Sequence, residues 1–367
     1  MSLWKNRSVF LTGHTGFKGS WLALWLAQMG AKVHGYALDP PSEPSNFEAS
    51  RVAEMLASHT IGDIRDHDRL LAAMKRARPD AVFHLAAQPL VRLSYETPRE
   101  TFDVNVLGTA SVLDAVRALG TPCTVLVITS DKCYENREHV WGYRECDAMG
   151  GYDPYSASKG AAEVLVASYR RSFFHPEKVA QHGVKLASVR AGNVIGGGDW
   201  AKDRIVTDVV AALAAGRPVP VRSPLAIRPW QHVLEPLSGY LALAEKMIAE
   251  NDPRWCDGWN FGPVAGDERP VRDLVETFVA AWGSGSWDDQ SNGQHPHEAK
   301  ILRLCIDKAR AELGWRPRWN FEEAVNRTAR WFQRHHRDPT KPMDEACRED
   351  IAAYVSARKA SAELIEV

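Results

Sequence analysis

The sequence predicts an α/β protein built on a doubly wound parallel sheet, with a smaller, mixed α/β lobe contributed mainly by its C-terminal part. In the first half of the chain, short apolar runs alternate with helical segments, which is typical of βα units. A glycine-rich turn separates the first run from the first helix. Beyond residue 193 the alternation loosens, which indicates a different architecture for the rest of the chain.

The composition is that of an ordinary globular protein of two domains, or of one domain with a lobe. The chain has 367 residues, of which 45% are hydrophobic and 25% charged, and its formal net charge is −1. This charge gives no electrostatic reason to expect binding to nucleic acid or to a membrane surface. No stretch reads as a signal peptide or a membrane span, and the six cysteines lack zinc-ligand spacing, so we expect a cytoplasmic protein with reduced thiols and no metal.

The first βα unit carries a candidate phosphate-binding turn. Ser8–Leu11 is expected to be a strand and Trp21–Leu26 a helix, and between them Gly13, Gly16 and Gly19 follow the pattern G-x-x-G-x-x-G. Glycines allow the backbone to turn tightly and to approach a pyrophosphate, and the helix N-terminus supplies free N–H groups. A glycine-rich turn without a ligand is the alternative, but its position between a strand and a helix favours a dinucleotide site.

The second strand is expected at Lys32–Leu38 and ends at Asp39, which lies 20 residues after Gly19. An acidic residue at this spacing accepts hydrogen bonds from the adenosine ribose and repels a 2′-phosphate. The sequence therefore favours NAD over NADP. The alternative is a loop aspartate in front of Pro40.

Three further segments are expected at the same edge of the sheet. Asp63 precedes an amphipathic helix around Leu70–Met74, where it either caps the helix or contacts adenine, and position alone does not separate these roles. Ala81–Gln88 is expected to be a buried strand running into small residues that allow a cofactor to approach. Asn105 opens a helix, where an asparagine is more often a buried hydrogen-bonding residue than a catalyst.

Two short stretches carry the candidate chemistry. Thr129–Tyr134 directly follows the apolar run Val125–Ile128, so it is expected at the carboxyl end of a buried strand, where open α/β sheets bind ligands. Tyr155 and Lys159 are four residues apart and share one face of a helix. A lysine charge beside a phenol lowers the phenol pKa, which would let Tyr155 act as a base.

The remaining elements are expected at Val184–Val189 (a sixth strand), Ile205–Ala215, Pro236–Glu250 and Arg272–Trp282 (helices), Val219–Val221 and Trp259–Gly262 (strands), Gly283–His297 (a loop) and two helices in the tail. We expect a discontinuous division of the chain. Residues 1–192 and about 228–262 would form the dinucleotide-binding domain. Residues 193–227 and about 263–367 would form the lobe.

Together these segments resemble the extended short-chain dehydrogenases/reductases that act on nucleotide sugars. The resemblance covers most of the chain and rests on the order and spacing of the glycine turn, Leu85–Gln88, Asn105, Tyr155 with Lys159, Arg190 with Asn193, Arg228 and Leu313–Trp315. It implies a Rossmann-type NAD-binding domain, a C-terminal lobe that holds the nucleotide sugar, and a homo-oligomer. Family members commonly pair through helices like Val106–Leu119 and Tyr155–Arg171.

Within that family, Ser130-Asp131-Lys132 resembles the hydroxyl, acid and base of nucleotide-sugar 4,6-dehydratases, and lysine in place of glutamate resembles those that act on CDP-glucose. The resemblance implies that Tyr155 deprotonates the 4-hydroxyl, assisted by Ser130 and Lys159, while hydride leaves C4 for NAD. Lys132 would then remove the C5 proton, or stabilise the enolate if it stays charged, and Asp131 would protonate the leaving 6-hydroxyl. The product would be CDP-4-keto-6-deoxyglucose, a precursor for deoxysugars and lipopolysaccharide O-antigen.

The resemblance also implies two sets of binding residues. The cofactor set is Gly13, Thr15, Gly16, Phe17, Lys18, Gly19, Asp39, Asp63, Ile64, Leu85, Ala86, Ala87, Gln88, Asn105, Thr129, Tyr155 and Lys159. The substrate set is Gln88, Ser130, Asn193, Arg190, Arg204 and Arg228, in which the three arginines suit a diphosphate because guanidinium binds it in a bidentate manner.

Two alternatives remain open at this point. A 4,6-dehydratase or epimerase acting on another nucleotide sugar would share the fold, although Asp131 and Lys132 argue against simple epimerisation. A non-catalytic NAD-binding scaffold or sensor would be expected to have lost Tyr155, Lys159 or Asp131, and all three are present.

Overall fold

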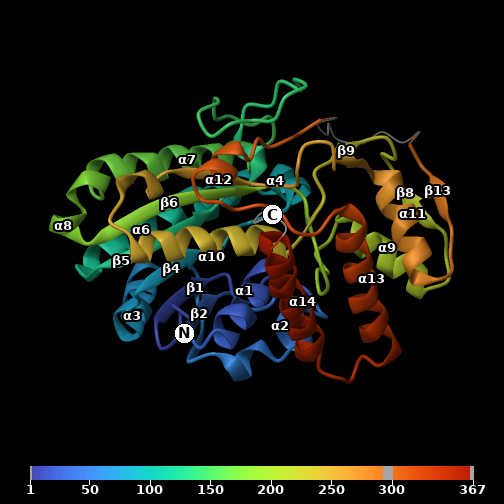
Figure 1. Cartoon of the computed structure of the whole chain (residues 1–367), viewed down its shortest axis with the longest axis horizontal. Helices are drawn as coiled ribbons and strands as arrows, with labels where there is room; N and C mark the ends of the chain where they lie inside the picture. Colours follow the sequence, from blue (N-terminus) through green and yellow to red (C-terminus); the bar gives the residue numbers. More distant parts are fainter. Residues whose placement is uncertain (1, 292–300, 364–367) are drawn as a thin grey trace.

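The chain folds around one parallel sheet whose carboxyl edge faces a second, smaller group of helices and strands (Figure 1). The computed structural model describes residues 2–291 and 301–363. The sheet has seven strands in the order β11-β6-β5-β4-β1-β2-β3. Their bounds are β1 Ser8–Thr12, β2 Lys32–Ala37, β3 Ser58–Ile61, β4 Ala81–His84, β5 Cys123–Ile128, β6 Val184–Ala191 and β11 Gly258–Phe261. All neighbouring strands in this sheet run parallel.

Helices cover both faces of the sheet. Helices α3, α6 and α7 pack on one face, and α1 and α10 on the other. The α-helices are α1 Phe17–Gln28, α2 Asn46–Ala49, α3 His67–Ala77, α4 Val91–Glu96, α5 Pro98–Phe102, α6 Gly108–Leu119, α7 Pro154–Ser172, α8 Val179–His182, α9 Ile205–Ala214, α10 Leu234–Ala249, α11 Val271–Trp282, α12 Asp307–Ala311, α13 Phe321–Arg337 and α14 Asp344–Glu363. Shorter helical turns are η1 Val52–Met55, η2 Asp103–Leu107, η3 Asp131–Cys133, η4 Pro176–Lys178 and η5 Pro253–Trp255.

Strand β5 shows why this part of the sequence reads as continuous apolar runs. All six of its residues are buried. Val125 and Val127 join the core on one face, whereas Leu126 and Ile128 join the core on the other. Because a parallel sheet is covered by helices on both sides, each alternating position of a central strand meets an apolar layer. The apolar run ends at Ile128, where the strand reaches the carboxyl edge of the sheet.

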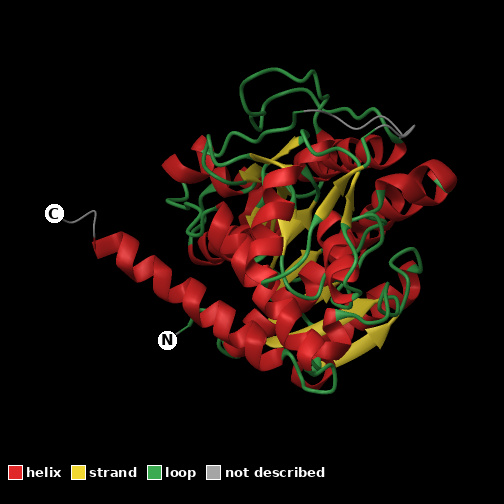
Figure 2. Cartoon of the chain, turned by 90° about the vertical axis from the view of Figure 1, so that its right-hand side faces the viewer, coloured by secondary structure: helices red, strands yellow, loops and turns green. Residues whose placement is uncertain are grey.

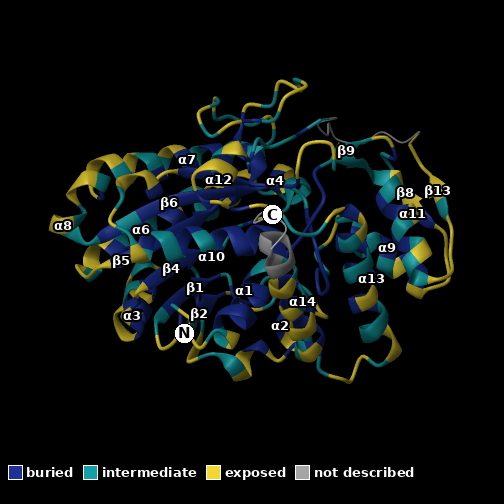
Figure 3. Ribbon diagram, viewed as in Figure 1, coloured by how far each residue is buried: buried dark blue, intermediate teal, exposed yellow. Residues whose placement is uncertain are grey.

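The smaller group lies to the right of the sheet in Figure 1 and contains α9, α11 and α13 with short strands. These strands are β7 Val194–Ile195, β8 Val219–Val221, β9 Ile227–Arg228, β10 Gln231–His232, β12 Arg269–Pro270 and β13 Trp287–Asp289. A single apolar core runs from α1 and α10 into this group, so the two parts are packed together (Figure 3). No described helix has the length and apolar character needed to span a membrane.

The predicted fold class is confirmed, with local corrections. The sequence analysis missed β3, whose residues Ser58–Ile61 are exposed or half-buried at the sheet edge and lack an apolar run. The predicted loop Gly283–His297 contains β13, which pairs with β8, and residues 292–297 of that loop lie outside the described residues. Asn105 lies in the π-helical turn η2 and not at the start of an α-helix.

Helix α14 is attached to the sheet domain by a buried polar contact. It packs against α1, and its C-terminal part projects away from the body of the molecule (Figure 2). Tyr354 donates a hydrogen bond to the Glu235 carboxylate on α10 at 2.5 Å and lies 2.9 Å from the Ser238 hydroxyl. Burial raises the pKa of Glu235 to about 7, against the opposing effect of the hydrogen bonds from Tyr354, Trp319 and Arg318.

We expect Tyr354→Phe to lower the free energy of unfolding by about 1–3 kcal/mol, because a buried carboxyl loses a donor. Urea denaturation measures this difference. Tyr152→Phe, at an exposed phenol, is the control and should leave the stability unchanged. An equal effect of both substitutions would contradict the assigned role of Tyr354.

Candidate active site

The glycine-rich turn forms a tight passage between β1 and α1. Gly13 has φ +76°, and a Cβ added there would lie 2.6 Å from the Ala86 backbone nitrogen. A Cβ at Gly19 would lie 2.0 Å from the Gly13 carbonyl oxygen. Gly16, at the start of α1, has only that same oxygen within 4 Å, at 3.4 Å, so the space beside it is open. The turn thus fits the pyrophosphate of a dinucleotide, with the α1 N-terminus directed at it.

The other expected cofactor residues fall at the same edge. Thr15, Phe17, Lys18, Leu85, Ala86 and Ala87 follow or adjoin β1 and β4, and Thr15 donates to the Leu38 carbonyl beside the exposed Asp39. Asp63 and Ile64 follow β3, and Asp63 forms a 2.6 Å ion pair with Arg65. Helix α3 is capped by Asp66, so the alternative that Asp63 caps this helix is wrong.

Asn105 and Gln88 support each other within the protein. The Asn105 amide bonds the backbone N–H and carbonyl of Gln88 and the Ser158 hydroxyl. The Gln88 side chain donates to Thr101 and accepts from the Leu90 backbone. Both residues are buried, and these bonds occupy their amide groups. These bonds hold the Gln88–Leu90 loop in position, and contact of either residue with a ligand stays a prediction.

The segment Thr129–Tyr134 turns sharply at the end of β5. Ser130 begins the turn η3 by accepting a hydrogen bond from the Lys132 backbone, and its hydroxyl donates to the Asp131 carboxylate at 2.9 Å. Asp131 is buried, and its second carboxylate oxygen has no hydrogen-bond partner among the described residues. Burial raises the pKa of Asp131, although Lys132, Ser130, Lys18 and Arg228 oppose the shift. A buried carboxyl with one unpartnered oxygen is suited to donate a proton.

Helix α7 presents Tyr155 and Lys159 on one face, as predicted. Asp153 caps the helix and Pro154 occupies its first turn, which fixes Tyr155 close to the N-terminus. The Lys159 ammonium lies 6.0 Å from the centroid of the Tyr155 ring, and burial lowers the pKa of Lys159 to about 8. Ser130 hydrogen-bonds with Tyr155 and lowers the Tyr155 pKa. The loop and the helix therefore meet at the phenol.

The expectation of a lowered phenol pKa is wrong for this structure. Burial raises the pKa of Tyr155 to about 12, and the charges of Asp131 and Asp153 act in the same direction. The Ser130 hydrogen bond and the Arg204 charge oppose this shift but are weaker. The sequence showed the neighbouring lysine but did not show the depth of burial.

Three basic side chains surround the reacting groups. The charges of Lys18 and Arg228 reach Asp131, and that of Arg204 reaches Tyr155. Arg204 also pairs with the buried Asp199 at 3.2 Å. Asn193, after β6, is half-buried, and its carbonyl accepts from Gln231. Arg204 and Arg228 thus lie near Tyr155 and Asp131, and the binding of substrate by these arginines and Asn193 stays a prediction.

Arg190, in contrast, lies behind the site. Its guanidinium forms two hydrogen bonds with the Glu163 carboxylate, at 2.9 and 2.8 Å, and donates to the Tyr134 phenol at 2.5 Å. Both members of the ion pair are about 95% buried. The expectation that Arg190 binds the diphosphate is corrected, because its donors are directed at protein groups inside the core.

Comparisons with known proteins decide the family. The sequence model of the family described as GDP-mannose 4,6 dehydratase matches residues 10–328. The chain is 51% identical to CDP-glucose 4,6-dehydratase of Salmonella typhimurium, over 97% of this chain and 98% of the relative. The chain belongs to the GDP-mannose 4,6-dehydratase family. Another dehydratase, dTDP-glucose 4,6-dehydratase of Streptomyces antibioticus, is 32% identical over 74% of this chain and 75% of the relative.

Solved structures of related enzymes have the same fold as this chain. The dTDP-glucose 4,6-dehydratase of Streptomyces venezuelae, solved with NAD and TYD bound, superposes with a TM-score of 0.74 at 22% identity, covering 91% of this chain and 99% of that one. The UDP-glucose 4-epimerase of Thermus thermophilus, solved with NAD, gives a TM-score of 0.74 at 25% identity, covering 89% and 98%.

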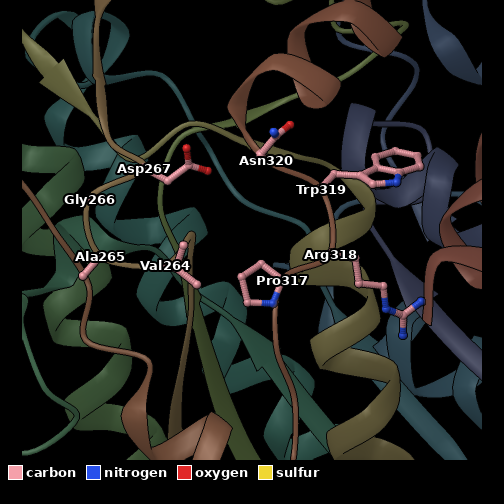
Figure 4. A pocket seen from close by; sticks show the side chains of 8 residues that line it. All are labelled: Val264, Ala265, Gly266, Asp267, Pro317, Arg318, Trp319 and Asn320. Atoms are coloured by element: carbon pink, nitrogen blue, oxygen red, sulfur yellow. The ribbon is translucent and has the colours of Figure 1, made fainter. Parts of the chain in front are cut away.

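The sequence did not predict two features of the structure, the buried Glu163 and a cavity. Glu163 lies one helical turn after Lys159, a spacing that could have drawn attention, but its partner Arg190 is distant in sequence. A cavity of about 440 Å³ between Val264–Asp267 and Pro317–Asn320 was also not expected (Figure 4). Its lining contains none of the predicted site residues.

We expect Gly19→Ala to weaken NAD binding at least tenfold, because the new methyl group would displace the Gly13 carbonyl and open the turn. Calorimetric titration with NAD measures this. Gly120→Asn is the control: nothing lies within 4 Å of a Cβ added at Gly120, and asparagine tolerates its positive φ of 65°. Unchanged affinity in Gly19→Ala would exclude the turn as the pyrophosphate site.

Because Glu163 and Arg190 form a buried ion pair, we expect the effect of Arg190→Leu on stability to depend on pH. Burial alone would raise the pKa of Glu163, but Arg190 and the hydrogen bonds hold it below its ordinary value. In the natural protein, the pair therefore stabilises the fold above the unfolded glutamate pKa of about 4.3, and this stabilisation is lost as pH falls through the lower folded-state pKa. Without Arg190 the buried carboxyl pKa rises instead, so the variant loses stability as pH increases above about 4.3.

Arg190→Leu should accordingly lower the free energy of unfolding by about 3–5 kcal/mol at neutral pH and by less near pH 5. Urea denaturation at the two pH values measures the difference. Arg330→Leu, at an exposed arginine of α13, should change stability by only about 0.5 kcal/mol at either pH. A penalty for Arg190→Leu that does not depend on pH would be evidence against a charged, paired Glu163.

Proposed function

We propose that this protein is an NAD-dependent lyase that converts CDP-glucose to CDP-4-keto-6-deoxyglucose and water. The observation that carries the proposal is the buried turn Ser130-Asp131-Lys132, which is placed against Tyr155 at the carboxyl edge of the sheet. An acid beside the alcohol-oxidising tyrosine is needed for loss of water but not for a simple epimerisation. The nucleotide is inferred from the 51% identity with CDP-glucose 4,6-dehydratase.

The first half of the proposed reaction uses α7. Tyr155 takes the proton of the 4-hydroxyl, and Ser130 hydrogen-bonds the same oxygen. Bound NAD would supply the acceptor, and later the donor, of the hydride. The Ser130 hydrogen bond and the Arg204 charge oppose the effect of burial on the Tyr155 pKa, and both favour its use as a base. Lys159, on the same face of α7, is assigned to the cofactor ribose.

The second half uses η3. Asp131 gives its proton to the departing 6-hydroxyl, which agrees with its raised pKa. Lys132 either removes the C5 proton or, as a cation, stabilises the enolate that forms next to the C4 ketone. Asp131 and Lys132 form no ion pair within the described residues, although the Lys132 charge still opposes the rise in the Asp131 pKa.

The diphosphate is assigned to Arg204 and Arg228, with Asn193 close by. Both guanidinium groups carry charge to the edge of the sheet where Tyr155 and Asp131 lie. Two separate arginines can neutralise the two phosphate groups of a nucleoside diphosphate and leave the sugar above the phenol.

We further propose that the enzyme works in the cytoplasm as a homo-oligomer and supplies 6-deoxysugars for surface polysaccharides such as O-antigen. Exposed apolar side chains on the expected pairing helices support oligomer formation. Leu107 is 59% exposed and Val164 60% exposed.

Mass spectrometry of CDP-glucose incubated with the purified protein tests the reaction, with UDP-, dTDP- and GDP-sugars in parallel. We expect loss of one water from the CDP sugar alone. Loss of water from another nucleotide sugar would keep the mechanism and reject the nucleotide. A product of unchanged mass would indicate epimerisation and remove the acid role of Asp131.

Asp131→Asn should lower the rate of water loss about 100-fold or more, because an amide does not replace a general acid. The rate of product formation with CDP-glucose measures this. Asp307→Asn, at an exposed aspartate of α12, is the matched control and should retain full activity. Retention of activity in Asp131→Asn would rule out Asp131 as the proton donor.

A further inference from the structure

The segment that carries Ser130, Asp131 and Lys132 is fixed at both of its ends by one buried ion pair. We call the pair of Glu163 on α7 and Arg190 on β6 the anchor pair. Glu163 lies eight residues after Tyr155 and four after Lys159, on the same face of α7. The anchor pair is therefore built into the helix that carries the tyrosine and the lysine of the proposed oxidation step.

The first end is held by Glu163. The Thr129 hydroxyl donates to one Glu163 carboxylate oxygen at 2.5 Å, and the Ser188 hydroxyl donates to the other at 2.7 Å. The Thr129 backbone N–H also bonds the Val189 carbonyl. This end is thus joined to both α7 and β6 before Ser130 begins the turn.

The second end is held by Arg190. Its guanidinium donates to the Tyr134 phenol at 2.5 Å and lies 5.1 Å from the centre of the Tyr134 ring. The phenol in turn donates to the Asn260 side chain at 2.8 Å, and the Asn260 amide bonds the Tyr143 and Cys305 carbonyls. Tyr134, Arg190 and Asn260 are all buried.

We propose that Tyr134, Arg190 and Glu163 are positioning residues that set the place of Asp131 and Lys132 relative to Tyr155. None of the three is assigned to substrate or cofactor. Each acts by holding the short segment between Thr129 and Tyr134. This inference rests on the proposed function, because it assigns Asp131 and Lys132 to the elimination step of a 4,6-dehydratase.

The geometry indicates which step depends on the second end. Tyr155 and Lys159 stand on α7 and form no hydrogen bond with the Tyr134 phenol in the described part of the chain, whereas Asp131 and Lys132 are part of the held segment. Ser130 is next to Thr129, so the first end keeps it in place. Releasing the Tyr134 end should therefore disturb the acid and the lysine of the elimination while leaving the oxidation at C4 nearly intact.

Tyr134→Phe is the test variant, since it removes the hydroxyl and keeps the ring. The ring stacks on Tyr143 with centroids 5.2 Å apart. Tyr143→Phe is the matched control: it makes the same change in the neighbouring buried ring, whose hydroxyl accepts from the Arg137 backbone and donates to Asn136 instead of meeting Arg190.

Single-turnover absorbance at 340 nm with CDP-glucose separates the steps, because the signal rises with oxidation at C4 and falls with return of hydride to C6. In Tyr134→Phe we expect a rise within threefold of the natural protein, a decay slowed at least tenfold, and KM within threefold. In Tyr143→Phe both phases should stay within threefold. Equal slowing of rise and decay, an unchanged decay, or the same result in both variants would overturn the proposal.

Hydrogen–deuterium exchange of the unliganded protein gives a readout that does not need turnover. We expect the backbone amides of residues 130–134 to exchange at least tenfold faster in Tyr134→Phe and in Thr129→Val, which releases the other end, and not in Tyr143→Phe. Unchanged exchange in both test variants would overturn the proposal. Absence of water loss from CDP-glucose with the natural protein would instead reject the proposed function, and the exchange data would still decide the role of the anchor pair.

Discussion

The buried ion pair between Glu163 and Arg190 is the interaction on which the candidate site depends. It joins helix α7, strand β6 and both ends of the Thr129–Tyr134 segment. Burying two charges costs several kcal/mol for each ion unless hydrogen bonds satisfy them, and here Thr129, Ser188 and Tyr134 complete the set. Such a fully satisfied network specifies one arrangement of its members. Helix α7 and the turn η3 are consequently joined through the same network.

Burial also divides the chemical roles. It raises the pKa of Asp131, which suits an acid, and it raises the pKa of Tyr155, which opposes its use as a base until a positive charge is close. It lowers the pKa of Lys159, so this lysine carries its charge less firmly than an exposed one. Two neighbouring oxygen acids with the same direction of shift can thus serve opposite steps of one reaction.

Local pattern predicted much of the fold and of the site. The apolar run ending at Ile128 predicted the strand that leads into η3, the glycine spacing predicted the turn between β1 and α1, and the four-residue spacing placed Tyr155 and Lys159 on one face of α7. Contacts between residues distant in sequence could not be predicted from the sequence. Arg190 follows an apolar strand and looks like a ligand-binding arginine, yet its partner is on another helix. Strand β3 was missed because an edge strand is not covered on both faces and lacks an apolar run.

The most direct test of the account is to follow the hydrogen from C4. CDP-glucose carrying deuterium at C4 would be converted in light water and the product examined by NMR. The account predicts deuterium at C6, because the hydride is held within the site between oxidation and return. Deuterium that stays at C4 would indicate epimerisation, and deuterium lost to solvent would contradict an internal transfer of hydride.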